Sequence, residues 1–164
     1  MDFKLFILLI AMFSVQMIDC VCSSQNIPLI KGIQADIPFS LFSGYNVVYN
    51  ESYSELTTST LLEGIRSSCS ANSIACVGCY LEGQNFVHLT ACGNCQEILT
   101  TGYGKMVYDT IWVNAADVNF VIMDIKDPTK SIIWALNTLG SSFDACGEYS
   151  ITSYSTLMKI ILTS

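Results

Sequence analysis

Residues 61–95 read LLEGIRSSCSANSIACVGCYLEGQNFVHLTACGNC and hold five of the chain's eight cysteines. Four of them form two CxxC units, Cys76 with Cys79 and Cys92 with Cys95. In a cytosolic protein this spacing is typical of a zinc ribbon, whose ligands are thiolates. In the secretory pathway the same thiols are oxidised and form disulfides. The compartment of the protein therefore decides how this stretch is interpreted.

The N-terminus indicates secretion. Lys4 precedes an uninterrupted apolar run, LFILLIAMF, from Leu5 to Phe13. A run of this length after a basic start is typical of a signal peptide and covers only about half of a membrane thickness. The triplet Cys20 to Cys22 supplies the small residues that precede a cleaved bond. We predict a signal peptide over residues 1–22, a mature chain from Ser23 and a secreted, extracellular protein.

Cleavage at this point removes two cysteines and leaves an even number, as a disulfide framework requires. A redox role for either CxxC unit is disfavoured, because a thioredoxin-type motif opens a helix after a strand and neither unit does so. We therefore expect disulfides in place of zinc, and no metal or cofactor. The cysteines expected to pair are Cys69, Cys76, Cys79, Cys92, Cys95 and Cys146.

The charge balance bears on the partners. The chain has 14 acidic and 7 basic residues, a net charge of −7. The basic residues are scattered and form no stripe, which argues against nucleic-acid binding. After the first apolar run no segment is long enough to form a membrane helix, and LMKIIL near the end is interrupted by Lys159. We expect no nucleic-acid partner and no membrane span in the mature protein.

One helix is predicted, from Leu61 to Ser68 or Cys69. Thr60 and Glu63 form a capping box, and apolar residues recur at helical spacing after them. Most other segments read as strands, because they are rich in β-branched and aromatic residues and end at turn residues. The expected extended segments are 34–42, 45–49, 74–81, 85–90, 105–113, 118–125, 131–136 and 149–162, the last in one or two pieces.

The quoted stretch resembles the PAN/apple family, in which a helix reading roughly sLxeCxxxC precedes C-x-g-f-x-y and then C-h-l. Here a capped helix with Cys69 in its last turn precedes CVGCYL, from Cys76, and then FVHLTAC. The family's other helix cysteine and its partner would fall near Gly64 and at Val87, so both are absent. The resemblance covers about Leu41 to Val113. It implies one short helix packed on a curved antiparallel sheet.

The resemblance also implies a disulfide. The family's bridge between the helix and the following strand maps onto Cys69 and Cys76. The remaining four cysteines allow three connectivities. We favour the one with a bridge across the hairpin and a bridge that ties the C-terminal part to the first module, Cys79 with Cys92 and Cys95 with Cys146.

The predicted fold is α+β and disulfide-stapled. Residues 23–113 form the PAN/apple-like module in this interpretation. Residues 114–164 form a β-rich extension that packs on the module as one unit, because about 50 residues are few for an independent domain.

Few residues suggest chemistry. His88 is the only histidine in the chain, and no G-x-S-x-G surrounds any serine. Trp112 and Trp134 lie in apolar segments and are expected in the core. Three carboxylates cluster near two asparagines, yet no calcium-loop motif is present and a structural turn is preferred. These carboxylates are Asp117, Asp124 and Asp127, near Asn114 and Asn119.

The sequence favours a secreted recognition or adhesion module that is not an enzyme. PAN/apple domains bind proteins or carbohydrates, so the resemblance implies one of these as the extracellular ligand. Two alternatives stay open: a secreted hydrolase that uses Asp117 and Asp124, and a matrix or coat component that self-associates through strand edges. Asn50 begins the sequon Asn-Glu-Ser within a polar run, and we predict a glycan there.

Overall fold

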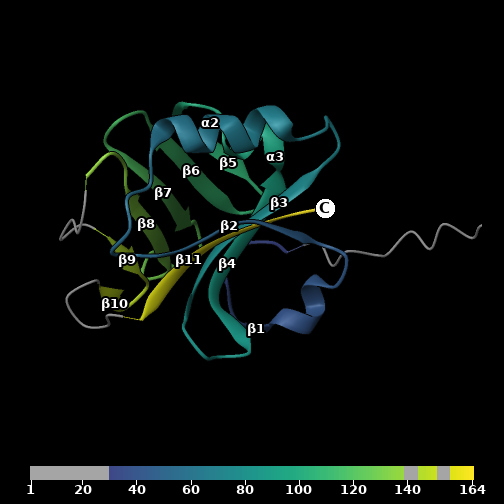
Figure 1. Cartoon of the computed structure of the whole chain (residues 1–164), viewed down its shortest axis with the longest axis vertical. Helices are drawn as coiled ribbons and strands as arrows, with labels where there is room; N and C mark the ends of the chain where they lie inside the picture. The colour runs from purple at the N-terminus through teal and green to yellow at the C-terminus, as the bar shows by residue number, and fades with distance from the viewer. Residues whose placement is uncertain (1–29, 139–143, 151–155) are drawn as a thin grey trace, which may run out of the picture.

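The computed structural model describes residues 30–138, 144–150 and 156–164. Within them the chain forms two antiparallel β-sheets that share a core (Figure 1). The fold is therefore mostly β, with few helices and three disulfides. The single sheet expected from the sequence is in fact two. The predicted signal peptide, residues 1–22, lies outside the described residues.

The five-stranded sheet has the strand order β1-β4-β3-β11-β2. β3 and β4 form a hairpin, and β11, near the C-terminus, pairs antiparallel with both β2 and β3. The sheet is therefore completed only when the end of the chain has been added. Its strands are β1 (Gln34–Pro38), β2 (Asn46–Ser52), β3 (Ile74–Leu81), β4 (Phe86–Asn94) and β11 (Leu157–Thr163).

The six-stranded sheet is a meander with the order β10-β9-β8-β7-β6-β5. Its strands are β5 (Gly102–Val107), β6 (Thr110–Ala115), β7 (Asn119–Asp124), β8 (Ser131–Ala135), β9 (Ala145–Cys146) and β10 (Tyr149–Ser150). The sequence predicted β5 and β6 as one strand. The turn between them is Tyr108-Asp109, with φ of 46° and 68°. Two-residue turns with two positive φ values usually contain Asn-Gly or Asp-Gly, so this pair gave no turn signal.

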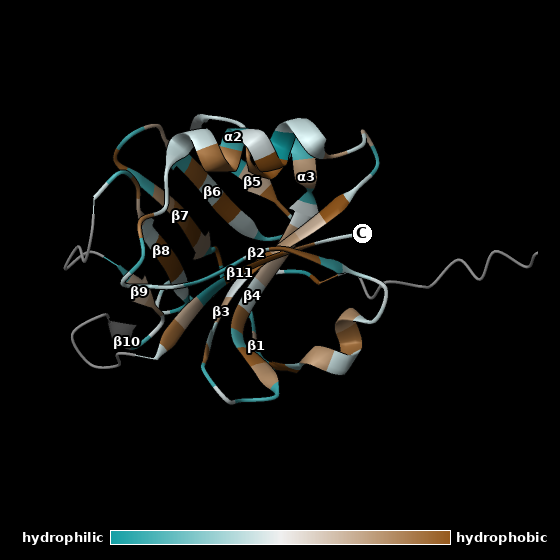
Figure 2. Ribbon diagram, in the orientation of Figure 1, coloured by the Kyte–Doolittle hydropathy of each residue, from teal (hydrophilic) through white to brown (hydrophobic). Residues whose placement is uncertain are grey.

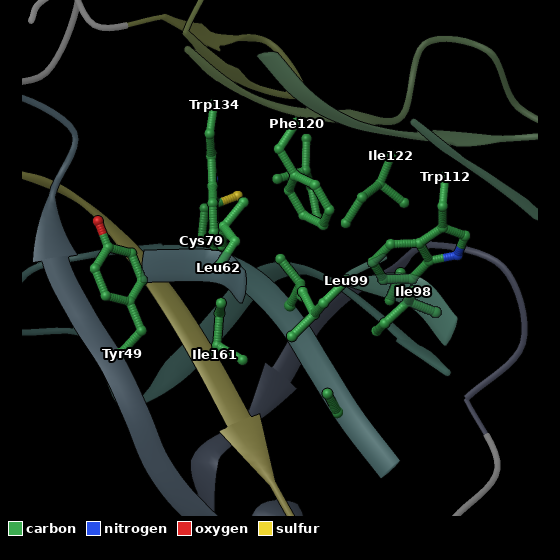
Figure 3. Close-up of a cluster of buried hydrophobic side chains, with 14 of the residues drawn as sticks. Tyr49, Leu62, Cys79, Ile98, Leu99, Trp112, Phe120, Ile122, Trp134 and Ile161 are labelled. Atoms are coloured by element: carbon green, nitrogen blue, oxygen red, sulfur yellow. The ribbon is translucent and has the colours of Figure 1, made fainter. Parts of the chain in front are cut away.

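Aromatic and aliphatic side chains from both sheets pack together in the shared core (Figure 3). Trp112, Ile122 and Ile132 are successive cross-strand partners, and none is more than 1% exposed. The ring of Phe120 lies with its centroid 5.9 Å from that of Trp112 and 5.6 Å from that of Trp134. Such pairs contribute about 0.5–1.5 kcal/mol each beyond the area they bury. Both tryptophans therefore serve the core, as the sequence predicted.

Helix α2 (Ser59–Ser68) lies across one end of the sheets, beside the short α3 (Cys95–Ile98) (Figure 1). Leu62 and Ile65 of α2 are buried in the shared core. The helix thus closes the end of the core between the sheets.

The helix begins earlier than its predicted start at Leu61. Its N-cap is Thr58, whose Oγ1 accepts a hydrogen bond from the backbone N–H of Leu61 at 3.1 Å. Thr58 has the extended backbone that an N-cap requires, whereas Thr60 is already helical. Glu63 pairs with Arg66 on the helix surface and makes no capping box.

The outer face of the five-stranded sheet is covered by the chain itself. The 3₁₀ helix η1 (Phe39–Phe42) and the segment around β1 form a second apolar cluster on it. Phe42 is buried there, and the ring of Phe39 meets the ring of Tyr80 edge-on at 5.2 Å. This sheet is therefore packed on both faces.

The six cysteines that lie in the described residues are all paired, but their connectivity differs from the expected one. The expected pairs Cys69–Cys76, Cys79–Cys92 and Cys95–Cys146 are wrong. The bridges are Cys69–Cys95, Cys76–Cys92 and Cys79–Cys146.

The register of the hairpin explains the correction. Cys76 lies directly opposite Cys92, with the two Cα atoms 4.1 Å apart, whereas Cys79 lies opposite Leu89. Because side chains alternate along a strand, Cys79 points to the opposite face from Cys76, into the shared core. There it meets Cys146 of β9 and bridges the two sheets. The remaining bridge, from Cys69, joins the end of α2 to the start of α3.

Strand pairing crosses the domain boundary that the sequence suggested. Val113 lies inside β6, which pairs on both sides within the six-stranded sheet. Residues 114–164 contribute strands to both sheets, since β11 belongs to the five-stranded one. The C-terminal residues therefore build the same core as the residues before them.

The bridge between the sheets should contribute more stability than the hairpin bridge. The sequence separation is 67 for Cys79–Cys146 and 16 for Cys76–Cys92. The chain-entropy model gives about 4 and about 3 kcal/mol for these loops. In urea denaturation, replacing both Cys79 and Cys146 by alanine should lower the free energy of unfolding by about 1 kcal/mol more than replacing both Cys76 and Cys92. Equal losses, or peptide mapping that joins Cys79 to Cys92, would contradict the bridge between the sheets.

Candidate functional site

The outer face of the six-stranded sheet carries two rows of apolar side chains. The pairing register gives one row from Met106 through Ile111 to Met123, which ends at Ser131, and another from Val113 through Val121 to Ile133. Their neighbours along each strand point the other way, into the core. We call these six residues the outer apolar face: Met106, Ile111, Val113, Val121, Met123 and Ile133.

Strands β6, β7 and β8 are hydrophobic along most of their length (Figure 2). An antiparallel sheet with one face in water normally alternates apolar and polar residues, whereas a strand buried on both sides reads as a continuous apolar run. IWV, FVIM and IIWA are continuous apolar runs within β6, β7 and β8. The hydropathy pattern of these strands is therefore typical of a sheet that is packed on both faces.

The described residues cover only one of these faces. None of the six residues of the outer apolar face belongs to either buried cluster of the described chain. Met106 is 72% exposed and Met123 is 37% exposed, and the other four are partly exposed. The five-stranded sheet, by contrast, has η1 on its outer face. Apolar surface of this kind marks interaction sites more often than chance.

The charges at one end of this sheet are paired within the chain. Lys126 Nζ lies 2.7 Å from Asp109 Oδ2, and Lys130 Nζ lies 3.8 Å from Asp127 Oδ2. Both pairs lie in the turns that follow β5 and β7. The rim at this end therefore presents neither an acidic nor a basic patch.

A second feature is a buried lysine on β11. Lys159 is 1% exposed, and its Nζ donates to the backbone O of Glu55 at 2.8 Å and to Thr57 Oγ1 at 2.6 Å. Its Nζ also lies 5.5 Å from the centroid of the Tyr53 ring. Burial lowers the pKa of Lys159 to about 8, against the opposing effect of nearby carboxylates such as Asp144. Lys159 thus holds the loop after β2 against β11.

The same region is tied to the six-stranded sheet by further hydrogen bonds. Trp134 Nε1 donates to Tyr53 Oη at 2.9 Å, and the Tyr53 hydroxyl donates to the backbone O of Ala145 at 3.3 Å. Burial raises the pKa of Tyr53 well above its usual value. Asp144 accepts a hydrogen bond from the backbone N–H of Ala135 at 2.6 Å. These polar groups connect the sheets and have partners, so their arrangement is that of a structural network.

The carboxylates singled out in the sequence do not form one site. Asp124 accepts backbone hydrogen bonds from Ile33 at 2.7 Å, Lys126 at 2.8 Å and Asp127 at 2.9 Å. Burial alone would raise the pKa of Asp124, but these donors outweigh it and the pKa is lowered. Asp117 lies in the turn at the other end of the β6–β7 hairpin. The two carboxylates are thus separated by the length of β7, about 20 Å for six residues.

Metal ligation finds no support in the part of the chain that the structure describes, where no three potential ligands gather. Asp127 accepts from the backbone N–H of Thr129 at 3.2 Å, which makes it part of the turn after β7. Asn114 is buried and donates to the backbone O of Leu99 at 2.8 Å. Asp127 therefore belongs to a turn, whereas Asn114 serves the core, a role that the sequence did not predict.

His88 lies on β4, partly buried, with Nδ1 3.3 Å from Asp36 Oδ1. It borders a shallow cleft of about 400 Å³ between the two sheets. The hydroxyl residue among those that line this cleft is Thr129, and its Oγ1 donates to Asp127 Oδ1 at 2.5 Å, which makes it part of the turn after β7. The residues around the cleft are Ala35, Leu89, Thr129, Lys130, Gly147 and Glu148.

Asn50 lies exposed on β2, at the edge of the five-stranded sheet. Its Oδ1 accepts a hydrogen bond from Tyr80 Oη at 2.8 Å. The side chain borders an open cleft of about 600 Å³ that also contains Glu51 and Glu55. The sequon is therefore at the surface, with its amide oxygen held by a neighbouring strand.

No protein-family model, curated protein or solved structure matches this chain. Within residues 30–138, 144–150 and 156–164, no helix has the length and hydropathy that a bilayer crossing requires.

The sequence interpretation missed both the outer apolar face and the buried lysine. The signal for the first was the continuous apolar pattern of the strands now seen in the six-stranded sheet. The signal for the second was a single lysine inside LMKIIL, which was taken only as an interruption of an apolar run.

The stability of the protein should rise with pH above about 8. Below that pH Lys159 is charged in both the folded and the unfolded state. Above it the folded state loses the proton first, so the unfolded state binds more protons and the free energy of unfolding increases. We expect a gain of about 1–2 kcal/mol between pH 8 and about 9.5 in urea denaturation.

The Lys159→Met variant should lack this rise, whereas Lys31→Met, which removes an exposed lysine, should keep it. A wild-type free energy of unfolding that stays flat or falls over this pH range would show that burial does not lower the pKa of Lys159 in the folded protein.

Asn50 should carry a glycan when the protein is made in a eukaryotic secretory host. The side chain is exposed, and its Nδ2 is the atom that is modified. Treatment with an N-glycosidase should increase gel mobility. The Ser52→Ala variant should lose this shift and Ser52→Thr should retain it, because the acceptor motif requires a hydroxyl residue at that position. An unchanged mobility in the wild type would show that the site is skipped.

Proposed function

We propose that this chain is a secreted extracellular recognition module that binds a protein partner through the outer apolar face and catalyses no reaction. The observation that carries this proposal is the uncovered apolar face of the six-stranded sheet. Its strands have the composition of a sheet that is packed on both sides, and the described chain packs only one side.

A protein ligand is favoured over a carbohydrate. The six side chains of the face are aliphatic or methionine, without a hydroxyl, amide or charged group. A carbohydrate site needs several hydrogen-bonding groups and commonly an aromatic ring for stacking. The two tryptophans, Trp112 and Trp134, are no more than 1% exposed and lie in the core. The aliphatic and methionine side chains of this face are suited to bind a flat apolar surface of another protein.

The extracellular setting is supported by the cysteines. Three disulfides join the cysteines of the described chain, and such bridges persist in oxidising compartments. The apolar run near the N-terminus is consistent with a signal peptide over residues 1–22. Likeness to PAN/apple domains stays part of the proposal. It rests on the order of α2, β3 and β4 alone, because the family-like bridge from Cys69 to Cys76 is not formed.

The hydrolase alternative is not favoured by the geometry. Its two candidate carboxylates, Asp117 and Asp124, lie at opposite ends of the β6–β7 hairpin. Pairs of carboxylates that share acid–base work in glycoside hydrolysis are at most about 9.5 Å apart.

The proposal can be tested with photo-methionine, a methionine analogue that cross-links to whatever protein it touches. Met106 and Met123 lie on the outer apolar face, and Met158 on β11 of the other sheet is an internal control. In the extracellular fluid of the native source, Met106 and Met123 should cross-link to a protein, and Met158 should not.

The Val121→Lys variant places a charge in the middle of the face and should abolish these cross-links. Leu41→Lys makes the same change at an exposed aliphatic residue of η1 and should leave them intact. Cross-links of equal yield in both variants, or none at Met106 and Met123 in the wild type, would defeat the proposal.

A further inference from the structure

We infer that the partner covering the outer apolar face is a second copy of this chain, in a symmetric dimer that packs the two six-stranded sheets face to face. This inference rests on the proposed function, since it names the partner of the same surface. It differs from association through strand edges, because the contact is between sheet faces.

The outer apolar face is chemically suited to pack against a second copy of itself. A two-fold interface brings the same patch of both copies together, so the patch must be complementary to its own surface. The six residues of the outer apolar face carry no charge, and the side chains that continue the same side of the sheet, Ser131 and Asn119, are uncharged too. Two copies therefore meet there without like-charge repulsion, and the hydroxyl and the amide can pair with each other across the two-fold axis. The flexible side chains of Met106 and Met123 can fill irregular gaps between two such surfaces.

At one end of the sheet the charged groups of the rim do not oppose a second copy. The chain has a net charge of −7, and two copies would repel each other if acidic groups met at the interface. At the end of the sheet that holds the β5–β6 and β7–β8 turns, Asp109 is paired with Lys126 and Asp127 with Lys130. These acidic groups are compensated within each copy before the copies meet.

The area of the face is sufficient for a weak, specific dimer. Four strands, β5 to β8, span about 19 Å, and a six-residue strand is about 20 Å long. The face therefore measures about 380 Å² in projection, and the relief of the side chains brings the area buried by two copies to the order of 1,000 Å². Interfaces of this size belong to weak, transient complexes, so we expect a Kd in the micromolar range.

The packing has a precedent inside the molecule. The six-stranded sheet already packs its inner face on another antiparallel sheet. Sheets pack in this way about 10 Å apart, with their strands inclined by about 30°. A second copy repeats this arrangement on the other side and yields four stacked sheets. Every face of the six-stranded sheet is then covered, as the apolar pattern of its strands requires.

The free edge of β2 is a poorer place for self-association. Asn50 lies on this strand, and Glu51 and Glu55 line the cleft beside it. Two copies joined there would bring these acidic groups together. The edge also carries the predicted glycan, which would obstruct strand pairing.

The decisive measurement is sedimentation velocity of the purified protein over concentrations from about 1 to about 500 µM, a range that spans the expected Kd. The wild type should change from the mass of one chain to that of two. Val121→Lys should weaken dimerisation at least about tenfold, because it buries two like charges near the symmetry axis. Val47→Lys on the β2 edge and Leu41→Lys on η1, both at exposed aliphatic residues, should dimerise as the wild type does.

A wild-type chain of one-chain mass throughout this range overturns the inference, and so does a dimer that Val47→Lys breaks and Val121→Lys leaves intact. Photo-methionine cross-links then separate the two ideas. Cross-links from Met106 and Met123 to a different protein would leave the proposed function standing while the inference fails. The absence of any cross-link would remove both.

Wild-type protein provides a readout that does not depend on whether a variant folds. In the ¹³C methyl spectrum of labelled methionine, the signals of Met106 and Met123 should shift with concentration over the same range as the mass. The signal of Met158, in the other sheet, should stay constant. Concentration-dependent shifts at Met158 alone would place the contact elsewhere and overturn the inference.

Discussion

The alternation of side chains along β3 is the constraint on which the rest of the fold depends. Cys76 and Cys79 are three residues apart, so they point to opposite faces of the five-stranded sheet. Cys76 meets Cys92 across the hairpin, on the face that η1 covers. Cys79 enters the shared core and joins Cys146 of the other sheet. One short strand thus fixes both the hairpin and the distance between the sheets.

The core uses two kinds of contact to hold the sheets together. At its centre, rings such as Phe120 and Trp134 pack between the sheets. Near β2, Lys159 holds the loop that follows this strand, and Tyr53 accepts a hydrogen bond from Trp134. Burying a cation costs free energy. The ammonium group of Lys159 offsets part of this cost by donating hydrogen bonds to Glu55 and Thr57 in that loop. The polar network therefore orients the edge of the sandwich, while the aromatic rings and the aliphatic side chains around them supply the apolar burial.

The two sheets differ in whether the described chain covers their outer faces. The chain uses the segment around η1 to cover the five-stranded sheet. It leaves the outer apolar face without a counterpart among the described residues. The proposed binding role rests on this asymmetry. Asp124, one of the two carboxylates considered for catalysis, is engaged by the backbone N–H of Ile33.

The sequence by itself determined the elements whose signals are local. The body of the helix from Leu61 to Ser68, the strand from Ile74 to Leu81 and the burial of both tryptophans follow from helical periodicity, β-propensity and hydropathy, which act over a few residues. The cap of the helix was predicted at Thr60 and lies at Thr58. Only the tertiary structure decided the pairing of the cysteines and the division into two sheets. Disulfide partners depend on strand register, and the partner of Cys79 is 67 residues away. The strands that form the outer apolar face appear in the sequence as short apolar runs. Its exposure could be recognised only once the strands were assembled, because hydropathy does not say which face of a sheet remains uncovered.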